Sequence, residues 1–414
     1  MIVIGAGAAG LAAAAALVDA GRSVLVLEAR ERIGGRCLTR RMPELPVPVE
    51  LGAEFIHGRP EVTFALLRKA GIAAIDSTRT QRFRSGGKLE PVDAFAEAQK
   101  AMRDKSALAR QDLSFADFLE RQKRLPAMTR ALALMMVQGF DAADPARVSA
   151  REIAEEWSSG AIGSSQLRPL GGYGPLLESL AGSGARLQLQ TIVREVRWRR
   201  GAVDLGATFL GKPWSARAPR ALITLPLGVL QSGSVRFTPG LKEKRRALQQ
   251  LASGPVIRVA MHFRHAFWEE ICPGVAFFHS PEAAFPTFWT PLPMRAPLLT
   301  AWAGGPKAAR LTGRPARQLV KQALGAVRSV FDENPQIESQ LVCALVQDWQ
   351  DDPHARGAYS YVTVGGQGAR DMLAAPLADT LYFAGEATDT EGEAGTVAGA
   401  LASGYRAARE LVTS

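Results

Sequence analysis

The sequence predicts an α/β fold in which a parallel sheet is joined to a second, interleaved unit. Three observations support this prediction. A short apolar strand at residues 1–4 leads through a glycine-rich turn into a helix of small residues at 11–20. A second apolar strand at 24–27 follows, so the chain opens with a β-α-β unit whose strands are expected to pair in parallel. At 414 residues the chain is too long for one ordinary core, and two domains are therefore expected.

The first turn has the pattern Gly-x-Gly-x-x-Gly, formed by Gly5, Gly7 and Gly10. Gly5 allows the tight turn, Gly7 lets backbone N–H groups approach a pyrophosphate, and Gly10 permits close packing of helix on strand. The helix N-terminus adds a dipole that favours phosphate. Glu28 ends the second strand, where a carboxylate can accept from both ribose hydroxyls. A glycine-rich turn with a purely structural role would not need the strand before it, the helix after it or the acidic Glu28. We therefore predict a Rossmann-type dinucleotide site.

A second glycine turn distinguishes between dinucleotides. Residues 28–36 read Glu-Ala-Arg-Glu-Arg-Ile-Gly-Gly-Arg, which extends the ribose strand and adds Arg30, Gly35 and Arg36. An NAD domain has no need of this extension, whereas an extended FAD has more phosphate and a ribityl chain to hold. We therefore predict FAD; the alternative is that both arginines are solvated surface charges.

The later elements alternate between the two units. Residues 61–157 are dominated by helical periodicity, with helix caps expected at Asp112, Ser114 and Ser149. This stretch continues a parallel sheet poorly and is assigned to the second domain. Strands are expected at 187–191, 193–197, 202–205, 221–226, 256–263, 298–303 and 380–385, and helices at 317–330 and 396–411.

The element order gives a discontinuous division of the chain. The FAD-binding domain is predicted to comprise residues 1–60, 175–235 and 375–414. An α+β substrate-binding domain is predicted to comprise residues 61–174 and 236–374.

Composition excludes several classes of function. The net charge is +10, but the basic residues occur singly or in pairs, so specific nucleic-acid binding is not expected. Cys37, Cys272 and Cys343 form neither a disulfide framework nor a metal motif, which favours a reducing, cytoplasmic location. The five histidines lack ligand spacing, and no metal is expected. The longest uncharged run, residues 2–18, is the phosphate loop rather than a signal peptide, and no membrane span is expected.

Further motifs run to the end of the chain. Residues 50–58 read Glu-Leu-Gly-Ala-Glu-Phe-Ile-His-Gly, and the others are Gly171-Gly172-Tyr173, Leu225-Pro226-Leu227-Gly228-Val229-Leu230, Trp349 with Asp352-Pro353 and residues 357–361, and residues 383–388 and 395–400. Together with residues 28–36, this ordered set resembles the flavin-containing amine oxidase family, which includes monoamine oxidases, polyamine oxidases and lysine-specific histone demethylases. The form of residues 50–58 is most similar to the polyamine oxidases and demethylases.

The resemblance implies which residues contact the cofactor. They are Ala9, Glu28, Arg30 and Arg36 at the adenosine and pyrophosphate, Val193 at the adenine, Glu386 with the preceding Gly385 near the ribityl and phosphate, Gly52, Ala53, Glu54 and Phe55 over the flavin ring, and Thr396 and Val397 beside it. The last two would begin a helix whose dipole can stabilise negative charge on the reduced flavin.

The resemblance also implies the substrate side. Trp349 and Tyr359 match aromatic residues that orient an amine toward flavin N5, although ordinary core packing is an equal alternative for Trp349. Ala358 stands where some family members carry the cysteine that bonds the flavin, so the FAD is expected to be non-covalent. Thr396 stands where monoamine oxidases carry a tyrosine, which favours the polyamine oxidase or demethylase side of the family.

Arg258 is a departure from the family pattern, which usually has a lysine that holds a water near N5 and assists the reaction with oxygen. Arginine keeps the charge but is larger and always protonated. It would hold the water, bind a substrate carboxylate, or leave oxygen a poor acceptor.

The predicted function is therefore FAD-dependent oxidation of a small-molecule amine, with O2 as the electron acceptor. Hydride passes from the carbon next to the amine to flavin N5, the imine is hydrolysed to an aldehyde, and O2 is reduced to H2O2. Two alternatives are a dehydrogenase or desaturase acting on a larger apolar or carboxylate-bearing molecule, and a flavin-binding scaffold without turnover.

Overall fold

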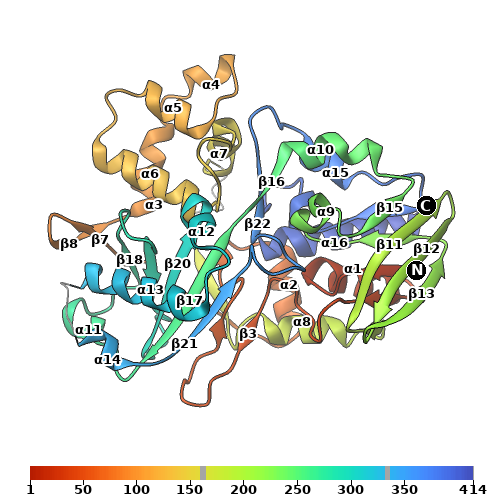
Figure 1. The fold of residues 1–414 in the computed structure, drawn as a ribbon, viewed down its shortest axis with the longest axis horizontal. Coiled ribbons are helices and arrows are strands. Elements are labelled where there is room, and N and C mark those ends of the chain that lie inside the picture. Colours follow the sequence, from red (N-terminus) through yellow and green to blue (C-terminus); the bar gives the residue numbers. More distant parts are fainter. Residues whose placement is uncertain (159–164, 332–335, 414) are drawn as a thin grey trace.

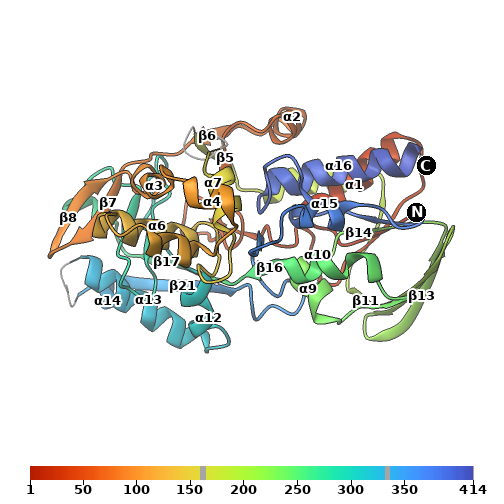
Figure 2. The same cartoon turned by 90° about the horizontal axis from the view of Figure 1, so that it is seen from above.

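The computed structural model describes residues 1–158, 165–331 and 336–413, and it contains two bodies that lie side by side (Figure 1). One body is built on a five-stranded sheet near both chain termini, and the other on a seven-stranded sheet. Seen from above, the two bodies remain separate, with chain segments crossing between them (Figure 2). This arrangement confirms the predicted α/β fold with an interleaved α+β unit.

The five-stranded sheet is parallel throughout. Its strands are mostly buried and apolar, as expected for a parallel sheet that is covered on both faces. Their order is β10 (Arg186–Gln188), β2 (Leu25–Leu27), β1 (Ile2–Ile4), β14 (Ala221–Ile223) and β23 (Leu381–Phe383). Distant parts of the chain therefore meet in one sheet.

Helices cover one face of this sheet and a second sheet covers the other. On the helical face, α1 (Ala8–Asp19), α8 (Gly174–Ala181) and α16 (Val397–Thr413) share one hydrophobic core. The residues of the opposite face pack against a four-stranded sheet. Its strands are β11 (Thr191–Arg199), β12 (Ala202–Phe209), β13 (Lys212–Ala218) and β15 (Arg236–Thr238).

The seven-stranded sheet forms the second body. All its neighbouring pairs are antiparallel except β18 with β7. The strand order is β21 (Leu341–Asp348), β17 (Val256–Phe263), β20 (Leu298–Gly304), β19 (Thr287–Trp289), β18 (Phe277–His279), β7 (Gln81–Ser85) and β8 (Lys88–Val92). The helices that accompany it are α11 (Trp268–Ile271), α12 (Gly305–Leu311), α13 (Ala316–Val330) and α14 (Ile337–Gln340).

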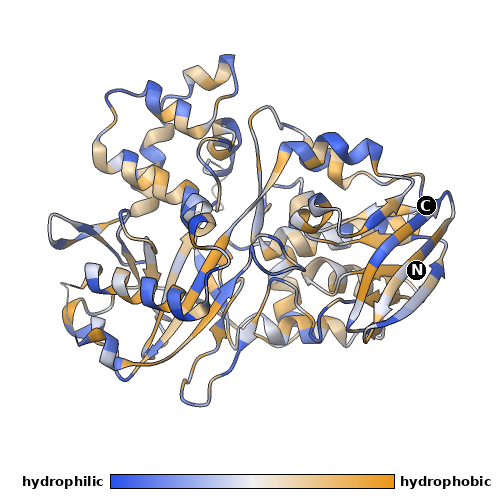
Figure 3. Cartoon of the chain, viewed as in Figure 1, coloured by the Kyte–Doolittle hydropathy of each residue, from blue (hydrophilic) through white to orange (hydrophobic). Residues whose placement is uncertain are grey.

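Side-chain alternation gives this sheet one apolar face and one mixed face. The odd-numbered residues of β17 and the buried residues of α13 belong to one hydrophobic core. Successive side chains of a strand point to opposite faces, so Arg258 lies on the other side. Register pairing places the following residues on the same face as Arg258: Gln81, Phe277, Thr287, Trp289 and Trp302. In Figure 3, β17 is coloured as largely hydrophobic, in contrast to the hydrophilic surface helix α10 (Arg245–Gln250).

Helices fill the beginning and the later part of the stretch 61–157, but not the residues between α2 and α3. Two of the three predicted caps are confirmed, because Ser114 Oγ accepts from Asp117 N at 3.1 Å and Ser149 Oγ accepts from Glu152 N at 3.2 Å. Asp112 is not a cap; its carboxylate accepts from Ser149 Oγ and from a distant backbone N–H. The helices of this stretch are α2 (Glu61–Lys69), α3 (Ala94–Gln99), η1 (Lys100–Met102), α4 (Ser106–Arg110), α5 (Phe115–Arg121), α6 (Ala127–Gly139) and α7 (Ala150–Glu156).

The prediction of a helical stretch was wrong between α2 and α3. These residues form the strand β6 (Ala74–Asp76) and the β7–β8 hairpin at the edge of the seven-stranded sheet. Gly86 and Gly87, both with positive φ, make the turn. The hairpin is polar on much of both faces, so it lacks the apolar alternation that identifies a strand.

Small sheets and short helices connect the two bodies. The ladder of β16 (Leu251–Gly254) with β22 (Tyr359–Val362) lies between them (Figure 1). The other elements are β3 (Thr39–Arg40), β4 (Val49–Glu50), β5 (Ile56–His57), β9 (Gln166–Pro169), α9 (Leu227–Ser232), η2 (Lys242–Lys244), α15 (Ala369–Ala374) and η3 (Glu386–Thr388). The predicted strand 256–263 is confirmed over its full length, whereas the division of the chain into domain ranges stays a prediction. Among the described residues, none forms a helix long and apolar enough to cross a membrane.

Candidate active site

A cavity of about 1260 Å³ runs from the first glycine turn to the mixed face of the seven-stranded sheet. It exceeds the roughly 300–1,000 Å³ of most small-molecule sites, so it has room for a large cofactor and a substrate. Of the residues predicted for the site, only Gly10 does not line it. The structure therefore brings the two ends of the chain to one cavity.

The first glycine turn has the geometry that a dinucleotide needs. Gly5 has a φ of 112°, and a side chain at Gly10 would overlap the carbonyl oxygen of Gly5, so the helix packs directly on the turn. At Gly7, apart from the glycine itself and its two neighbours in the chain, no atom of the described residues lies within 4 Å of the position that a Cβ would take. Gly7 also lines the cavity and precedes α1, so a phosphate can approach the backbone there.

Glu28 is fixed at the end of β2 by two backbone donors. Its Oε2 accepts from Ala6 N and its Oε1 from Arg30 N, both at 2.9 Å. An ionised carboxylate has about four acceptor sites, so it retains capacity for ribose hydroxyls. The side chain of Arg30 donates to Asp352 Oδ1 at 2.6 Å, which joins the predicted adenosine site to a residue 322 positions away.

An ion pair joins the two predicted cofactor walls. Arg36 donates to Glu386 Oε1 at 2.9 Å and to the carbonyl of Ala358 at 2.6 Å. The second oxygen of Glu386 accepts from Ser360 Oγ at 2.7 Å. Burial raises the pKa of Glu386, but the nearby guanidinium groups of Arg36 and Arg370 outweigh it, and the pKa is lowered overall. The carboxylate is therefore ionised at neutral pH.

Trp349 packs on the segment predicted to pass over the flavin ring. Its indole N–H donates to Leu51 O at 3.0 Å, and a Cβ on Gly52 would lie 3.1 Å from its ring. The side chain is buried and also lines the cavity. Trp349 is thus a packed core residue that also lines the cavity, and its role in orienting an amine stays a prediction.

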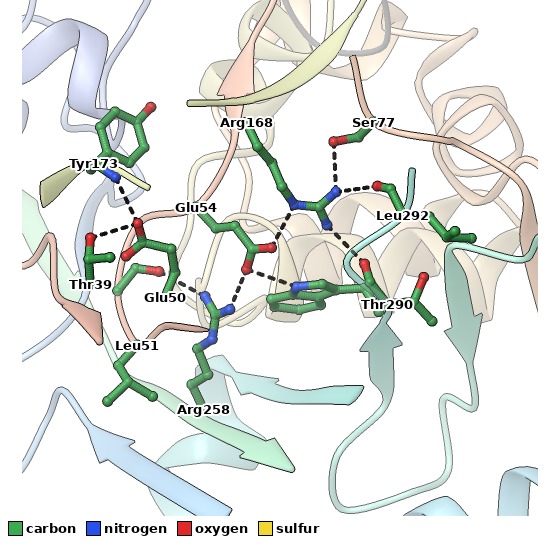
Figure 4. Close-up of polar contacts among 12 residues, drawn as sticks. Thr39, Glu50, Leu51, Glu54, Ser77, Arg168, Tyr173, Arg258, Thr290 and Leu292 are labelled. Carbon is green, nitrogen blue, oxygen red and sulfur yellow. Dashed lines mark hydrogen bonds and ion pairs between the residues drawn. The ribbon is translucent and has the colours of Figure 1, made fainter. Parts of the chain in front are cut away.

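Glu54 lies between two arginines (Figure 4). It accepts from Arg258 and, at 2.7 Å, from Arg168 Nε. The indole N–H of Trp289 donates to the same carboxylate at 2.9 Å. Arg168 was not predicted as a site residue, because a single arginine in the Gln-Leu-Arg-Pro of β9 has no local pattern that separates it from surface charge.

A second buried carboxylate, Glu50, explains why two motifs of the sequence occur together. Glu50 Oε1 accepts from Thr39 Oγ1 at 2.8 Å and from Tyr173 N at 2.7 Å (Figure 4). A Cβ on Gly172 would overlap this oxygen, so only glycine fits there. Burial raises the pKa of Glu50 to about 7.

Thr396 and Tyr359 lie near each other at the start of α16. Thr396 Oγ1 accepts from Gly399 N at 3.0 Å and so caps the helix, whose first residues line the cavity. The ring of Tyr359 lies beside Gly395, and its hydroxyl donates to Phe140 O at 2.6 Å. Both side chains are thus held in place by backbone groups, and the positive end of the helix dipole faces the cavity.

Aromatic rings cover much of the wall beyond Tyr359. Phe55 contacts Phe277 and Trp289 at centroid distances of 5.9 and 5.7 Å, and His57 contacts Phe140 at 5.2 Å. Burial lowers the pKa of His57 to about 4, so this ring is neutral at physiological pH.

A further set of carboxyl groups at the cavity was absent from the sequence-based prediction. Its members line the cavity and are Asp141, after α6; Glu152, Glu155 and Glu156, on α7; and Asp389 and Glu393, in the loop before α16. Neither carboxylate oxygen of Asp141 accepts a hydrogen bond from the described residues, although both are buried.

Burial shifts the protonation of this group. It raises the pKa of Asp141 well above its ordinary value, and the charge of Glu156 raises it further. The indole N–H of Trp157 acts in the opposite direction without meeting the geometry of a hydrogen bond. Burial likewise raises the pKa of Glu156, and it raises that of Glu393 to about 7.

Comparison with known proteins identifies the class of protein. Residues 8–412 match the family described as flavin containing amine oxidoreductase, and the chain belongs to this family of enzymes. Lysine-specific histone demethylase 2 of Homo sapiens is 30% identical, covering 99% of this chain and 53% of its own length. Polyamine oxidase 4 of Oryza sativa subsp. japonica is 28% identical, covering 99% and 88%. The chain thus spans about half the length of the demethylases it matches.

Solved structures share the fold. Putrescine oxidase bound to putrescine has a TM-score of 0.82 at 21% identity, covering 100% of this chain and 98% of its own. Cyclohexylamine oxidase from Brevibacterium oxydans has a TM-score of 0.82 at 22% identity, with the same coverage.

The family implies a flavin, and the residues present fit one. The open approach to Gly7 suits a phosphate. Arg258 lines the cavity, and its buried Nε–H has no acceptor from the described residues. Gly7, Glu28 and Arg30 would hold the nucleotide end, and residues 52–55 with Thr396 would hold the ring.

Replacing Glu28 by Gln is expected to weaken FAD binding. The neutral amide keeps the size of the side chain but binds ribose hydroxyls less strongly, and hydrogen bonds to a charged group contribute about 1.5–3 kcal/mol. Titration of the apoprotein with FAD measures the effect, with the exposed Glu31→Gln as a matched control. Equal FAD affinity in both variants would rule out the ribose role.

Proposed function

We propose that this protein is an FAD-dependent amine oxidase that binds its FAD non-covalently and takes a cationic amine as substrate. Bound FAD would accept a hydride at N5 from the carbon next to the amine nitrogen, which would leave an imine. Water would then hydrolyse the imine to an aldehyde, and O2 would take the electrons from the flavin and be reduced to H2O2. The residues of the chain bind and orient the amine, exclude water and supply charge.

The observation that carries this proposal is the set of carboxyl groups of Asp141, Glu152, Glu155, Glu156, Asp389 and Glu393 at the cavity, which we call the acidic wall. The protein as a whole has a net charge of +10, yet these carboxyl groups line one cavity. Burial raises the pKa of Tyr359, and two of these groups, Asp141 and Glu156, lie close enough to raise it further. Asp141 has two buried oxygens without a donor from the described residues, and an ammonium group has three N–H donors to offer. Burying such a carboxylate without a partner is costly, which favours a cationic ligand.

Aromatic rings next to these acids suit the same ligand. Phe140 and Tyr359 line the same cavity as the carboxyl groups, and aromatic rings of this kind can attract a cation. The nitrogen that reacts must be uncharged, and loss of water in an aromatic compartment lowers the pKa of an amine. A ligand with two amino groups would place one at the acids and the other near N5.

Arg258 and Ala358 bear on the alternatives. The guanidinium of Arg258 is already bound by Glu54 and by the carbonyl of Gly52, so a substrate carboxylate would have to compete for it. This disfavours a carboxylate-bearing substrate.

The methyl side chain of Ala358, at the cavity, has no atom that can bond a flavin, which supports non-covalent FAD. The three cysteines are free, which supports the proposed cytoplasmic location.

Relatives support the substrate class by name. Among the similar structures are a putrescine oxidase and a cyclohexylamine oxidase, and among the similar sequences is a polyamine oxidase. The putrescine oxidase is named for an amine with two amino groups, which is the kind of substrate that we propose for this protein.

The direct test is anaerobic reduction of the FAD-loaded protein by a panel of amines, followed by peroxide measurement after air is admitted. Diamines and polyamines are expected to bleach the flavin spectrum and then to yield H2O2. Bleaching by a non-amine while all amines are inert would support a dehydrogenase or desaturase. No bleaching by any compound would favour the scaffold alternative.

Replacing Asp141 by Asn is expected to raise the KM of a diamine by roughly tenfold or more, because a charge-assisted hydrogen bond is lost. The KM of a monoamine of similar length changes less, since it lacks the second ammonium. Steady-state kinetics with both substrates measure the difference, and the exposed Glu120→Gln on α5 is the control. An equal loss for both substrates would contradict a distal ammonium site at Asp141.

The acidic wall also predicts a pH dependence. Because the pKa values of Glu393 and Glu156 are raised to about 7, these two groups are largely neutral below pH 6 and gain charge as the pH rises. The pKa of Asp141 is raised as well. The affinity for a diamine should therefore increase through pH 7. The ratio of diamine to monoamine affinity removes the titration of the reacting amine itself, and a ratio that stays flat from pH 6 to 8.5 would be incompatible with this account.

A further inference from the structure

We propose that Arg168 is a positioning residue that, through Glu54, holds Arg258 at the cavity, and that the three groups together place one net positive charge beside the flavin ring and raise its reduction potential. This inference rests on the FAD binding of the proposed function, not on the identity of the amine.

Arg168 is anchored from four sides and does not itself line the cavity. Besides Glu54, its guanidinium donates to Ser77 Oγ at 2.8 Å and to the carbonyls of Leu292 and Thr290 at 2.6 and 3.0 Å (Figure 4). It also lies 4.4 Å from the centroid of the Phe55 ring. These bonds leave Arg168 little freedom, so the position of the carboxylate of Glu54 is determined from this side.

Glu54 in turn fixes the position of the Arg258 guanidinium. One guanidinium nitrogen of Arg258 binds Glu54, and the other donates to the carbonyl of Gly52 at 3.0 Å. The guanidinium lies 5.0 Å from the Trp289 ring. Its Nε–H is buried and has no acceptor from the described residues, and the side chain lines the cavity. Arg258 is thus held at the segment predicted to pass over the flavin ring.

The charges of this cluster do not cancel. Burial raises the pKa of Glu54, but Arg258 and Arg168 outweigh it and the pKa is lowered overall, so the carboxylate is ionised. Two guanidinium groups and one carboxylate leave one positive charge. Glu50 also interacts with Arg258, and because its pKa is raised to about 7 it is largely neutral at pH 6. At that pH the net charge of one persists.

A buried positive charge favours the reduced cofactor. A hydride adds two electrons and one proton to the flavin, so the ring gains one negative charge unless another proton follows. Charge interactions are strong where water is excluded. Removing the positive charge should therefore shift the equilibrium between oxidised and reduced flavin toward the oxidised form.

The test is the midpoint potential of the FAD-loaded protein at pH 6, measured by spectroelectrochemical titration without an amine. Arg168→Gln removes one positive charge and should favour oxidised flavin by about tenfold, which is about 30 mV for a two-electron couple. Glu54→Gln removes the negative charge and should shift the potential in the opposite direction. Arg168→Lys keeps the charge and should restore most of the shift, and the exposed Arg314→Gln is the control.

Shifts of the midpoint potential in opposite directions in Arg168→Gln and Glu54→Gln would distinguish an effect of charge from damage to the fold, because a distorted site has no reason to respond to the sign of the removed charge. An unchanged potential in Arg168→Gln, or a lower potential in Glu54→Gln, would overturn the proposal. If one of these variants does not retain FAD, the sign of the shift in the other decides. The potentials need no amine, so a failure of the proposed amine oxidation would leave this test intact.

Discussion

The ion pair between Arg36 and Glu386 joins residues 350 positions apart, and the cavity depends on it. Arg36 also binds the carbonyl of Ala358, and Glu386 binds Ser360, so the strand β22 from between the two bodies is tied to both chain ends. Both members are at least half-buried and line the cavity. Removing one partner of a buried pair costs several kcal/mol, roughly 3–5, so this contact strongly constrains how the two chain ends meet beside β22.

The carboxyl groups that line the cavity differ in their partners. Glu28 and Glu386, on the predicted nucleotide side, are bound by backbone donors or arginine. Glu54 is bound by two arginines. Asp141 has no donor from the described residues. One part of the cavity thus suits a bound anion and another a bound cation, which is the requirement of a cofactor with phosphates and a substrate with amino groups.

Local patterns allowed much of this to be predicted from the sequence. The glycine turns, Glu28 and the strand 256–263 were identified because backbone requirements and apolar runs are local signals. Arg168, Asp141 and the β7–β8 hairpin were not, since their significance lies in partners far along the chain or in a strand without apolar alternation. Arg258 was singled out by the family resemblance, but its attachment to Glu54 was visible only in three dimensions.

The most direct measurement of the whole account is a crystal structure of the protein with FAD and a diamine bound. The account predicts the pyrophosphate at Gly7, the flavin ring between residues 52–55 and the start of α16, one amine nitrogen near the ring and the other within hydrogen-bond distance of Asp141. A flavin ring placed elsewhere in the cavity, or a diamine bound without contact to the acidic wall, would contradict it.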